Sequence, residues 1–258
     1  NAHHILYIPV NYIFYKVISA VFGLPVLEYY SLQLFSLLCS LIFLYVIYIT
    51  FRRMTGDILL SVLTMALLSS TYGIWYYAVN AEVHMAGLAL AASGIYVLGA
   101  HGQGRGGVVF GALLLVLAAG FHLTNGLLFV PACLALVWSR TQRWQRLFLF
   151  LLAYFIFLGG IYAVFAHLSG QEVIRFLASQ VVGIDPYSGV PNGYWSSLGA
   201  AEQARSLRAL AHAVTLSWSG WGGALAVVLV FLGSVGGVFW FGRSQRDRFW
   251  LAPMLAWL

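Results

Sequence analysis

The chain has 258 residues, of which 62% are hydrophobic and 8% are charged. A soluble domain of this size cannot bury so large an apolar fraction, so the composition predicts an integral membrane protein. The net charge of +6 does not indicate nucleic-acid binding, because the arginines are scattered between the apolar segments.

The apolar segments are continuous and lack the alternation of lipid-facing and inward-facing residues that is typical of a transmembrane barrel. Backbone groups inside a bilayer must be paired within a helix or a closed barrel. The sequence therefore predicts an all-α fold, a polytopic transmembrane helical bundle. Both cysteines, Cys39 and Cys133, lie inside apolar segments, which predicts neither a disulfide framework nor a metal site.

Residues 10–22 form the first predicted element, an amphipathic helix. Apolar side chains recur along one face at helical spacing, and Asn11, Lys16 and Ser19 lie on the other face. The helix is roughly 20 Å long, too short for a hydrocarbon core of about 30 Å. Gly23 and Pro25 end it. We therefore expect an interfacial helix that lies in the plane of the membrane surface.

The remaining apolar runs predict membrane-spanning helices. Residues 108–138 are too long for one straight span and too short for two, and polar residues interrupt them between Gly120 and Gly126. Two half-helices that meet at a turn, 108–119 and 126–138, fit this length better. The full spans are expected at about 30–51, 58–78, 83–100, 146–167 and 215–241, with a partial span at 249–258.

A single integral membrane domain, residues 1–258, is the simplest organisation, because the sequence contains no evident repeat or low-complexity segment. The chain has no initiator methionine, and its last apolar run, 249–258, is shorter than a full span. We therefore expect an excerpt of a longer protein, cut at both ends.

The basic residues in the loops predict the orientation. Nine of the thirteen fall on one side, which the positive-inside rule makes the cytoplasm. The opposite side carries the interfacial helix, Glu82 and a loop of residues 169–213, long enough to be functional. The histidines expected on that side are His3, His4, His84 and His122. The low charge and the single lysine are compatible with a bacterial inner membrane, with the site on the extracytoplasmic side.

Glu82 is one of only seven acidic residues and stands between two predicted spans. An ionisable side chain at the membrane is costly unless it is paired or solvated, which makes Glu82 a functional candidate. In an extended loop Glu82 and His84 could both reach one metal ion, whereas on a helix they point apart. The alternative is structural, with Asn80 capping the next helix and Glu82 facing the helix dipole.

Three short motifs share an order and a predicted side of the membrane. They are Asn1-Ala2-His3-His4-Ile5-Leu6-Tyr7, Ala81-Glu82-Val83-His84, and Gly120-Phe121-His122-Leu123-Thr124-Asn125 followed by Pro131. Together they resemble the protein O-mannosyltransferase-like branch of the GT-C membrane glycosyltransferases. The resemblance covers residues 1–168 and implies a fragment that lacks the first span and the first outer loop. The chain departs from the branch at His84, where the branch has tyrosine.

The resemblance implies an inverting glycosyltransferase. It would move a sugar from a polyprenyl-phosphate donor to a protein or glycan acceptor on the extracytoplasmic face. Glu82 would support a general base that lies upstream of Asn1, and the leaving phosphate would need cationic or metal stabilisation. The metal would be Mg²⁺ or Mn²⁺, with Glu82 and His84 as ligands.

The residues expected to contact substrate are His3, His4, His84, His122, Asn125 and Arg175. Two of them have structural alternatives. Asn125 could cap the backbone that the break in residues 108–138 leaves unpaired. Arg175 could pair with Glu172 instead of the donor phosphate.

A transporter or flippase for a lipid-linked or small polar solute is the rival from another class, because transporters also contain broken helices. It predicts polar residues on both sides of the midplane, whereas residues 30–51 and 146–166 hold almost no ionisable groups. A non-catalytic relative of the same family is a third possibility. An acidic residue just upstream of Asn1 would favour the enzyme.

Overall fold

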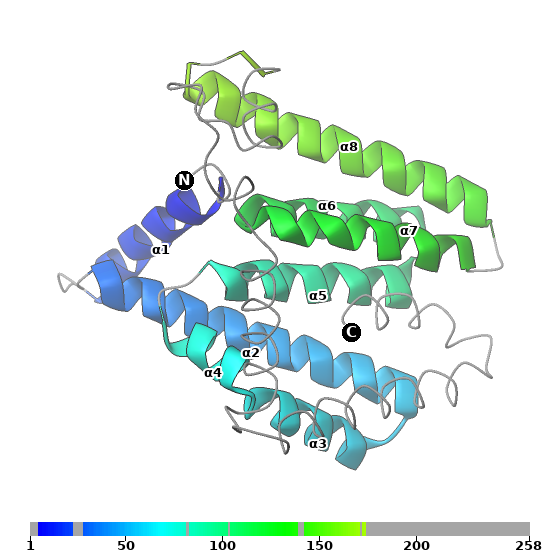
Figure 1. Ribbon diagram of the computed structural model, residues 1–258, viewed down its shortest axis with the longest axis horizontal. Coiled ribbons are helices and arrows are strands. Elements are labelled where there is room, and N and C mark those ends of the chain that lie inside the picture. The colour runs from blue at the N-terminus through cyan, green and yellow to red at the C-terminus, as the bar shows by residue number, and fades with distance from the viewer. Residues whose placement is uncertain are drawn as a thin grey trace, which may run out of the picture.

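The structure, a computed structural model, describes residues 5–22, 28–80, 83–102, 104–138, 142–170 and 172–173. In this part of the chain every regular element is a helix (Figure 1), so the predicted all-α bundle is confirmed. The helices are α1 (Tyr7–Phe22), α2 (Glu28–Thr55), α3 (Ile58–Ser69), α4 (Tyr72–Val79), α5 (His84–His101), α6 (Arg105–Phe121), the 3₁₀ helix η1 (Leu123–Leu128), α7 (Phe129–Trp138) and α8 (Arg143–Leu168). The predicted spans at 215–241 and 249–258 and most of the loop at 169–213 lie outside the described residues.

Two of the described helices, α2 with 28 residues and α8 with 26, are long and apolar enough to cross a membrane. Helices α3 and α4 pass the same test only as a pair, and the chain bends by 67° between them. This pair is either a broken span or a re-entrant loop. The described residues therefore hold two candidate spans, or three if the bent pair is one span.

The bend between α3 and α4 differs from the straight span predicted over 58–78. Three consecutive hydroxyl side chains, Ser69, Ser70 and Thr71, each bond back to a backbone carbonyl three residues earlier, at 2.7 to 2.8 Å. Hydroxyls that bond the preceding turn compete with the helical backbone ladder and bend helices. Three such bonds in succession account for the end of α3 within an apolar run.

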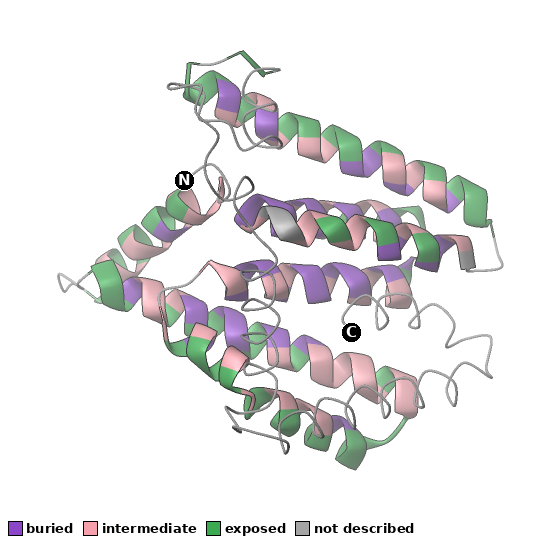
Figure 2. Cartoon of the chain, in the orientation of Figure 1, coloured by how far each residue is buried: buried purple, intermediate pink, exposed green. Residues whose placement is uncertain are grey.

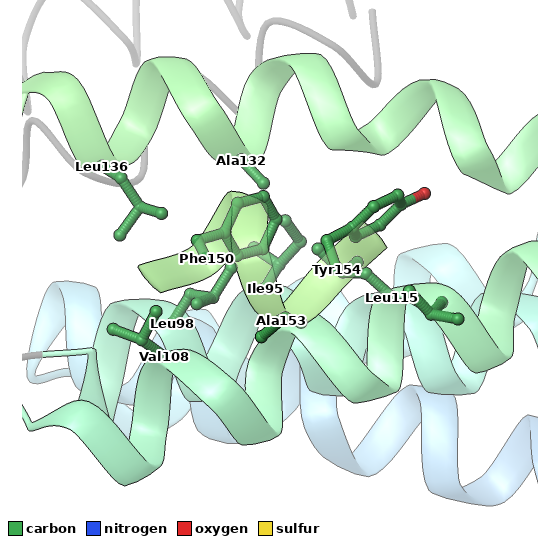
Figure 3. Packing of buried hydrophobic residues seen from close by; sticks show 11 residues of the cluster. Ile95, Leu98, Val108, Leu115, Ala132, Leu136, Phe150, Ala153 and Tyr154 are labelled. Atoms are coloured by element: carbon green, nitrogen blue, oxygen red, sulfur yellow. The ribbon is translucent and has the colours of Figure 1, made fainter. Parts of the chain in front are cut away.

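Helices α5 and α6 form the centre of the bundle, with α2 on one side and α7 and α8 on the other (Figure 1). The buried residues concentrate on α5 and α6, whereas α3 and α8 expose much of their surface (Figure 2). In Figure 3, Phe150 and Tyr154 of α8 belong to one apolar cluster with side chains of α5, α6 and α7. The labelled partners are Ile95, Leu98, Val108, Leu115, Ala132 and Leu136.

The antiparallel helices α5 and α6 approach closely at two facing glycines. A Cβ atom at Gly111 would lie 2.6 Å from Leu98 Cγ and 3.3 Å from the Gly94 carbonyl oxygen. A Cβ atom at Gly94 would lie 3.2 Å from the Gly111 carbonyl oxygen. Small residues let helix backbones approach in this way in membrane proteins, where close packing replaces the hydrophobic effect between helices. This contact holds the two helices in one register.

The bundle has two chemically different ends. At one, which we call the arginine end, α2 finishes with Arg52 and Arg53, α6 begins at Arg105, and α8 begins with Arg143 and Arg146 (Figure 1). Arg53 donates to the Ala100 carbonyl near the end of α5, with the atoms 3.2 Å apart, which ties α2 to α5 there.

At the other end, which we call the histidine end, α5 begins at His84 and α6 finishes beside His122. Helix α1 and the start of α2 lie at this end as well (Figure 1). Among the described lysines and arginines, only Lys16 belongs to the histidine end. The charge asymmetry predicted from the loops is therefore present along the axis of the described helices.

Helix α1 starts at Tyr7, three residues earlier than predicted, and lies obliquely to α2 (Figure 1). Phe14 packs inward on Phe35 of α2 with ring centroids 5.2 Å apart, while Ile13, Val17 and Val21 are exposed. An exposed row of branched apolar side chains is costly in water and is typical of a lipid-facing surface. The exposed apolar surface of α1, α3 and α8 thus supports a bilayer environment for the protein.

Candidate functional site

Two histidines that are 38 positions apart in the sequence lie in contact at the histidine end. His84 is the first residue of α5, and His122 directly follows the last residue of α6. Their ring centroids are 4.6 Å apart and the ring planes are inclined by 35°. Because α5 and α6 are antiparallel, the start of one helix lies beside the end of the other. The structure therefore brings together two of the residues that the sequence predicted to contact substrate.

Tyr77 of α4 completes a cluster of three rings. Its ring centroid lies 4.7 Å from that of His84, and all three side chains are half-buried. We call Tyr77, His84 and His122 the ring cluster. The sequence did not single out Tyr77, because one tyrosine within a run of aromatic residues has the ordinary appearance of a membrane-interface residue. Half-buried imidazoles can donate or accept hydrogen bonds while remaining accessible to a ligand.

The end of α4 is fixed against α2. Gln33 donates through Nε2 to the Val79 carbonyl, at 2.9 Å, and the Asn80 side chain donates to the Tyr76 carbonyl, also at 2.9 Å. The first bond satisfies a carbonyl of the last turn of α4, and the second is made to a carbonyl that also accepts the backbone N–H of Asn80, at 3.1 Å. Gln33 was missed by the sequence reasoning, since no local pattern pairs it with a residue 46 positions away.

The structural alternative for Asn80 is wrong. The residue preceding α5 is Val83, which makes no side-chain capping bond, while Asn80 belongs to the end of α4. Its extended backbone, with φ −98° and ψ 157°, takes the chain away from α4. Glu82 lies outside the described residues, so its predicted role and the metal site that it would form with His84 stay predictions.

Asn125 holds the turn that follows α6. Its Nδ2 donates to the Ala118 carbonyl at 3.1 Å, and its backbone N–H donates to the His122 carbonyl at 2.9 Å. The Ala118 carbonyl also accepts the backbone N–H of His122, at 3.0 Å. Asn125 therefore has the structural role that was its alternative, although the Ala118 carbonyl that it bonds is not left unpaired by the break. Its two bonds close the turn that contains His122. Its predicted contact with substrate stays a prediction.

Gly87 of α5 makes room for the Asn125 side chain, because a Cβ atom at this position would overlap Asn125 Nδ2. Gly87→Ala is therefore expected to displace Asn125 from the Ala118 carbonyl. The expected loss of stability is about 1–3 kcal/mol, the range for overpacking and for a lost buried hydrogen bond. Thermal unfolding of the full-length protein in lipid nanodiscs would measure it.

The control for Gly87→Ala is the double variant that also carries Asn125→Ala. In the double variant the methyl group added at position 87 no longer overlaps the Asn125 side chain. The double variant should be as stable as Asn125→Ala alone, giving a large coupling between the two positions. Additive effects of the two changes would contradict the contact.

The segment before α1 is attached to the end of α6. The backbone N–H of Leu6 donates to the Gly120 carbonyl at 3.0 Å, and a Cβ atom at Gly120 would lie 2.6 Å from Leu6 Cδ1. Next to this bond, Phe121 stacks on Phe35 of α2 with ring centroids 6.3 Å apart. These contacts join the segment before α1, the end of α6 and α2. They pack the residues that precede His122 in the sequence.

Several predicted site residues cannot be placed. His3, His4 and Arg175 lie outside the described residues, so the pairing of Arg175 with Glu172 is untested as well. Within the described residues no group of three or more His, Cys, Asp or Glu side chains is arranged to hold a metal ion. The thiols of Cys39 and Cys133 are free and lie on different helices.

Comparisons of this chain with protein-family models, curated proteins and solved structures gave no match.

Proposed function

We propose that this chain acts as a GT-C-type membrane glycosyltransferase. It transfers a sugar, with inversion, from a polyprenyl-phosphate donor to an acceptor on the extracytoplasmic face. The observation that carries the proposal is the contact between His84 and His122 at 4.6 Å. Each histidine comes from one of the motifs that resemble this family, Ala81–His84 and Gly120–Asn125, and the packing of α5 against α6 brings the two histidines into contact.

The ring cluster supports the proposal chemically. When the glycosidic bond to a polyprenyl phosphate breaks, negative charge develops on the leaving phosphate. Groups already placed to donate hydrogen bonds to that charge lower the barrier. Each imidazole has one N–H when neutral and two when protonated, so His84 and His122 carry the kind of donor group that a phosphate oxygen accepts from. Glu82, two residues before His84, is proposed as a supporting carboxylate, with a divalent metal as an optional further partner.

The separation of the two ends favours an enzyme with a one-sided site over a transporter. The described basic residues concentrate at the arginine end, and the ring cluster lies at the opposite end. By the positive-inside rule we propose that the ring cluster lies on the extracytoplasmic side of a multi-pass protein in a bacterial inner membrane. A transporter needs polar groups along its path, whereas the interior of α2 and α8 carries almost no ionisable side chains.

The test uses the full-length protein in sealed liposomes that contain a polyprenyl-phosphate sugar with a radiolabelled hexose. With an acceptor mixture present, the proposal predicts labelled acceptor and free polyprenyl phosphate in equal amounts. A flippase would instead move the intact lipid between leaflets and release neither product. Lipid movement without bond cleavage would reject the proposal in favour of that rival.

Glu82→Gln in the full-length protein is expected to lower the transfer rate about 10- to 100-fold, the usual effect of losing a supporting group around a charged site. The substitution keeps the size and removes the charge, so folding should be little affected. Initial rates at saturating donor would measure it, with thermal unfolding as the check on stability. Wild-type transfer by this variant would remove Glu82 from the site.

A further inference from the structure

Helix α4 presents an unusual aromatic face. Tyr72, Trp75 and Tyr76 lie on one side of this eight-residue helix, at spacings of three and four residues. All three are exposed, Trp75 to 58% and Tyr72 to 46%. We call these three residues the aromatic face.

The aromatic face is continuous with the ring cluster. Tyr72 contacts Tyr76 with ring centroids 5.7 Å apart, and Tyr76 contacts Tyr77 at 5.4 Å in an edge-on arrangement. Tyr77 in turn contacts His84, the residue that leads on to His122. A row of rings therefore runs from the exposed surface of α4 to the two imidazoles. The contacts of Tyr72 with Tyr76 and of Tyr76 with Tyr77 are local to α4, whereas the contact of Tyr77 with His84 joins α4 to α5.

The helix that carries the row is also anchored to α2. The Val79 carbonyl at the end of α4 accepts from Gln33 of α2, and the 67° bend turns α4 away from the direction of α3. Binding surfaces gain affinity when their side chains are ordered before the ligand arrives. A row of exposed rings on an anchored helix, ending at a proposed reaction centre, has the properties of a substrate subsite.

We infer that the aromatic face binds the sugar units of a glycan acceptor, whose growing end lies at the ring cluster. The inference rests on the proposed function, and between a protein and a glycan acceptor it selects the glycan. Sugar rings have apolar C–H faces bordered by hydroxyls, and tyrosine and tryptophan combine an apolar ring with a polar edge. The Tyr77 ring lies between the aromatic face and His84. The aromatic face therefore suits an acceptor longer than a monosaccharide.

The test measures direct binding of mannotriose and maltotriose to the full-length protein in lipid nanodiscs. Saturation-transfer NMR detects the bound sugar. At least one trisaccharide should bind the wild type, and more tightly than the corresponding monosaccharide. Trp75→Ala and Tyr76→Ala should each weaken binding roughly three- to tenfold, the size of one aromatic contact. Trp75→Phe, which keeps a ring, should weaken it less. These exposed side chains can be replaced with little effect on folding.

Trp144→Ala is the matched control, because Trp144 is 64% exposed but lies at the start of α8, at the arginine end. It should leave trisaccharide binding unchanged. The inference is overturned if neither trisaccharide binds the wild type, or if Trp75→Ala and Trp144→Ala behave alike, which would make both ordinary interface anchors. Failure of sugar transfer in the liposome assay, with trisaccharide binding intact, would instead count against the proposed function.

Discussion

Gly111→Ala is expected to destabilise the protein, whereas the same change at Gly159 should leave it equally stable or slightly more stable. The expected loss at Gly111 is about 1–3 kcal/mol, the usual cost of inserting a methyl group into a well-packed contact. At Gly159 the higher helix propensity of alanine favours the variant by up to about 1 kcal/mol. Thermal unfolding of both variants in the same lipid nanodiscs would measure the difference.

The reason for the opposite signs lies in the surroundings of the two glycines. A Cβ atom at Gly111 would lie 2.6 Å from Leu98 Cγ and 3.3 Å from the Gly94 carbonyl oxygen, so the Leu98 side chain or the two helices must shift. Gly159 lies in the middle of α8 on an exposed surface, and a Cβ atom there would have no atom within 4 Å. Both glycines are helical and both lie in apolar segments. Equal shifts for the two variants would therefore contradict the contact between α5 and α6.

A change at Gly111 should also reach the ring cluster. The register of α5 against α6 is what brings the first residue of α5 beside His122. If larger residues force the helices apart, the two imidazoles separate although neither has been altered. Gly111→Leu is thus expected to lower activity along with stability, while Gly159→Leu should do neither.

Much of the fold was predictable because it depends on local properties of the chain. Long apolar runs have to be helical in a bilayer, and this reasoning located the helices of the two candidate spans, α2 and α8. Length alone indicated that residues 108–138 could not be one straight helix. The structure has α6 and α7 there, joined by the 3₁₀ helix η1, so the predicted pair of short helices is present.

The features that were not predictable depend on contacts between distant residues, or on side-chain hydroxyls that compete with the backbone for hydrogen bonds within a helical turn. The bend after Ser69 arises because three hydroxyls bond the preceding carbonyls, and hydropathy over 58–78 does not register that competition. The sequence is compatible with Asn80 as a cap for the next helix, but its side chain bonds the Tyr76 carbonyl of the preceding helix. Tyr77 joined the site only through its contact with His84, which is a property of the folded chain.

The candidate site was predictable only in part, because its residues can be identified one by one but their contact depends on the fold. His84 and His122 were selected individually, from their motifs and their expected side of the membrane. Their direct contact depends on the antiparallel register that Gly94 and Gly111 permit, and a sequence without the structure does not fix that register. Contact between them is what turns two separate candidates into one proposed phosphate-binding group.

Replacing His84 or His122 by alanine in the full-length protein is expected to lower the rate of sugar transfer about 100- to 1000-fold, the effect of removing one stabiliser of transition-state charge. The effect should fall on kcat, because the negative charge on the phosphate develops as the glycosidic bond breaks. The measurement is the initial rate of acceptor labelling over a range of donor concentrations. Thermal unfolding of each variant separates lost chemistry from lost structure.

The double variant makes this prediction specific to the pair. If the two imidazoles receive the same phosphate, the second alanine should cost much less than the first, and the two effects will not be additive. His101→Ala is the control, because His101 ends the helix that His84 begins and lies at the arginine end. It should transfer sugar at the wild-type rate. Fully additive losses at His84 and His122, or an equal loss at His101, would mean that the contact between the imidazoles serves packing and that the phosphate binds elsewhere.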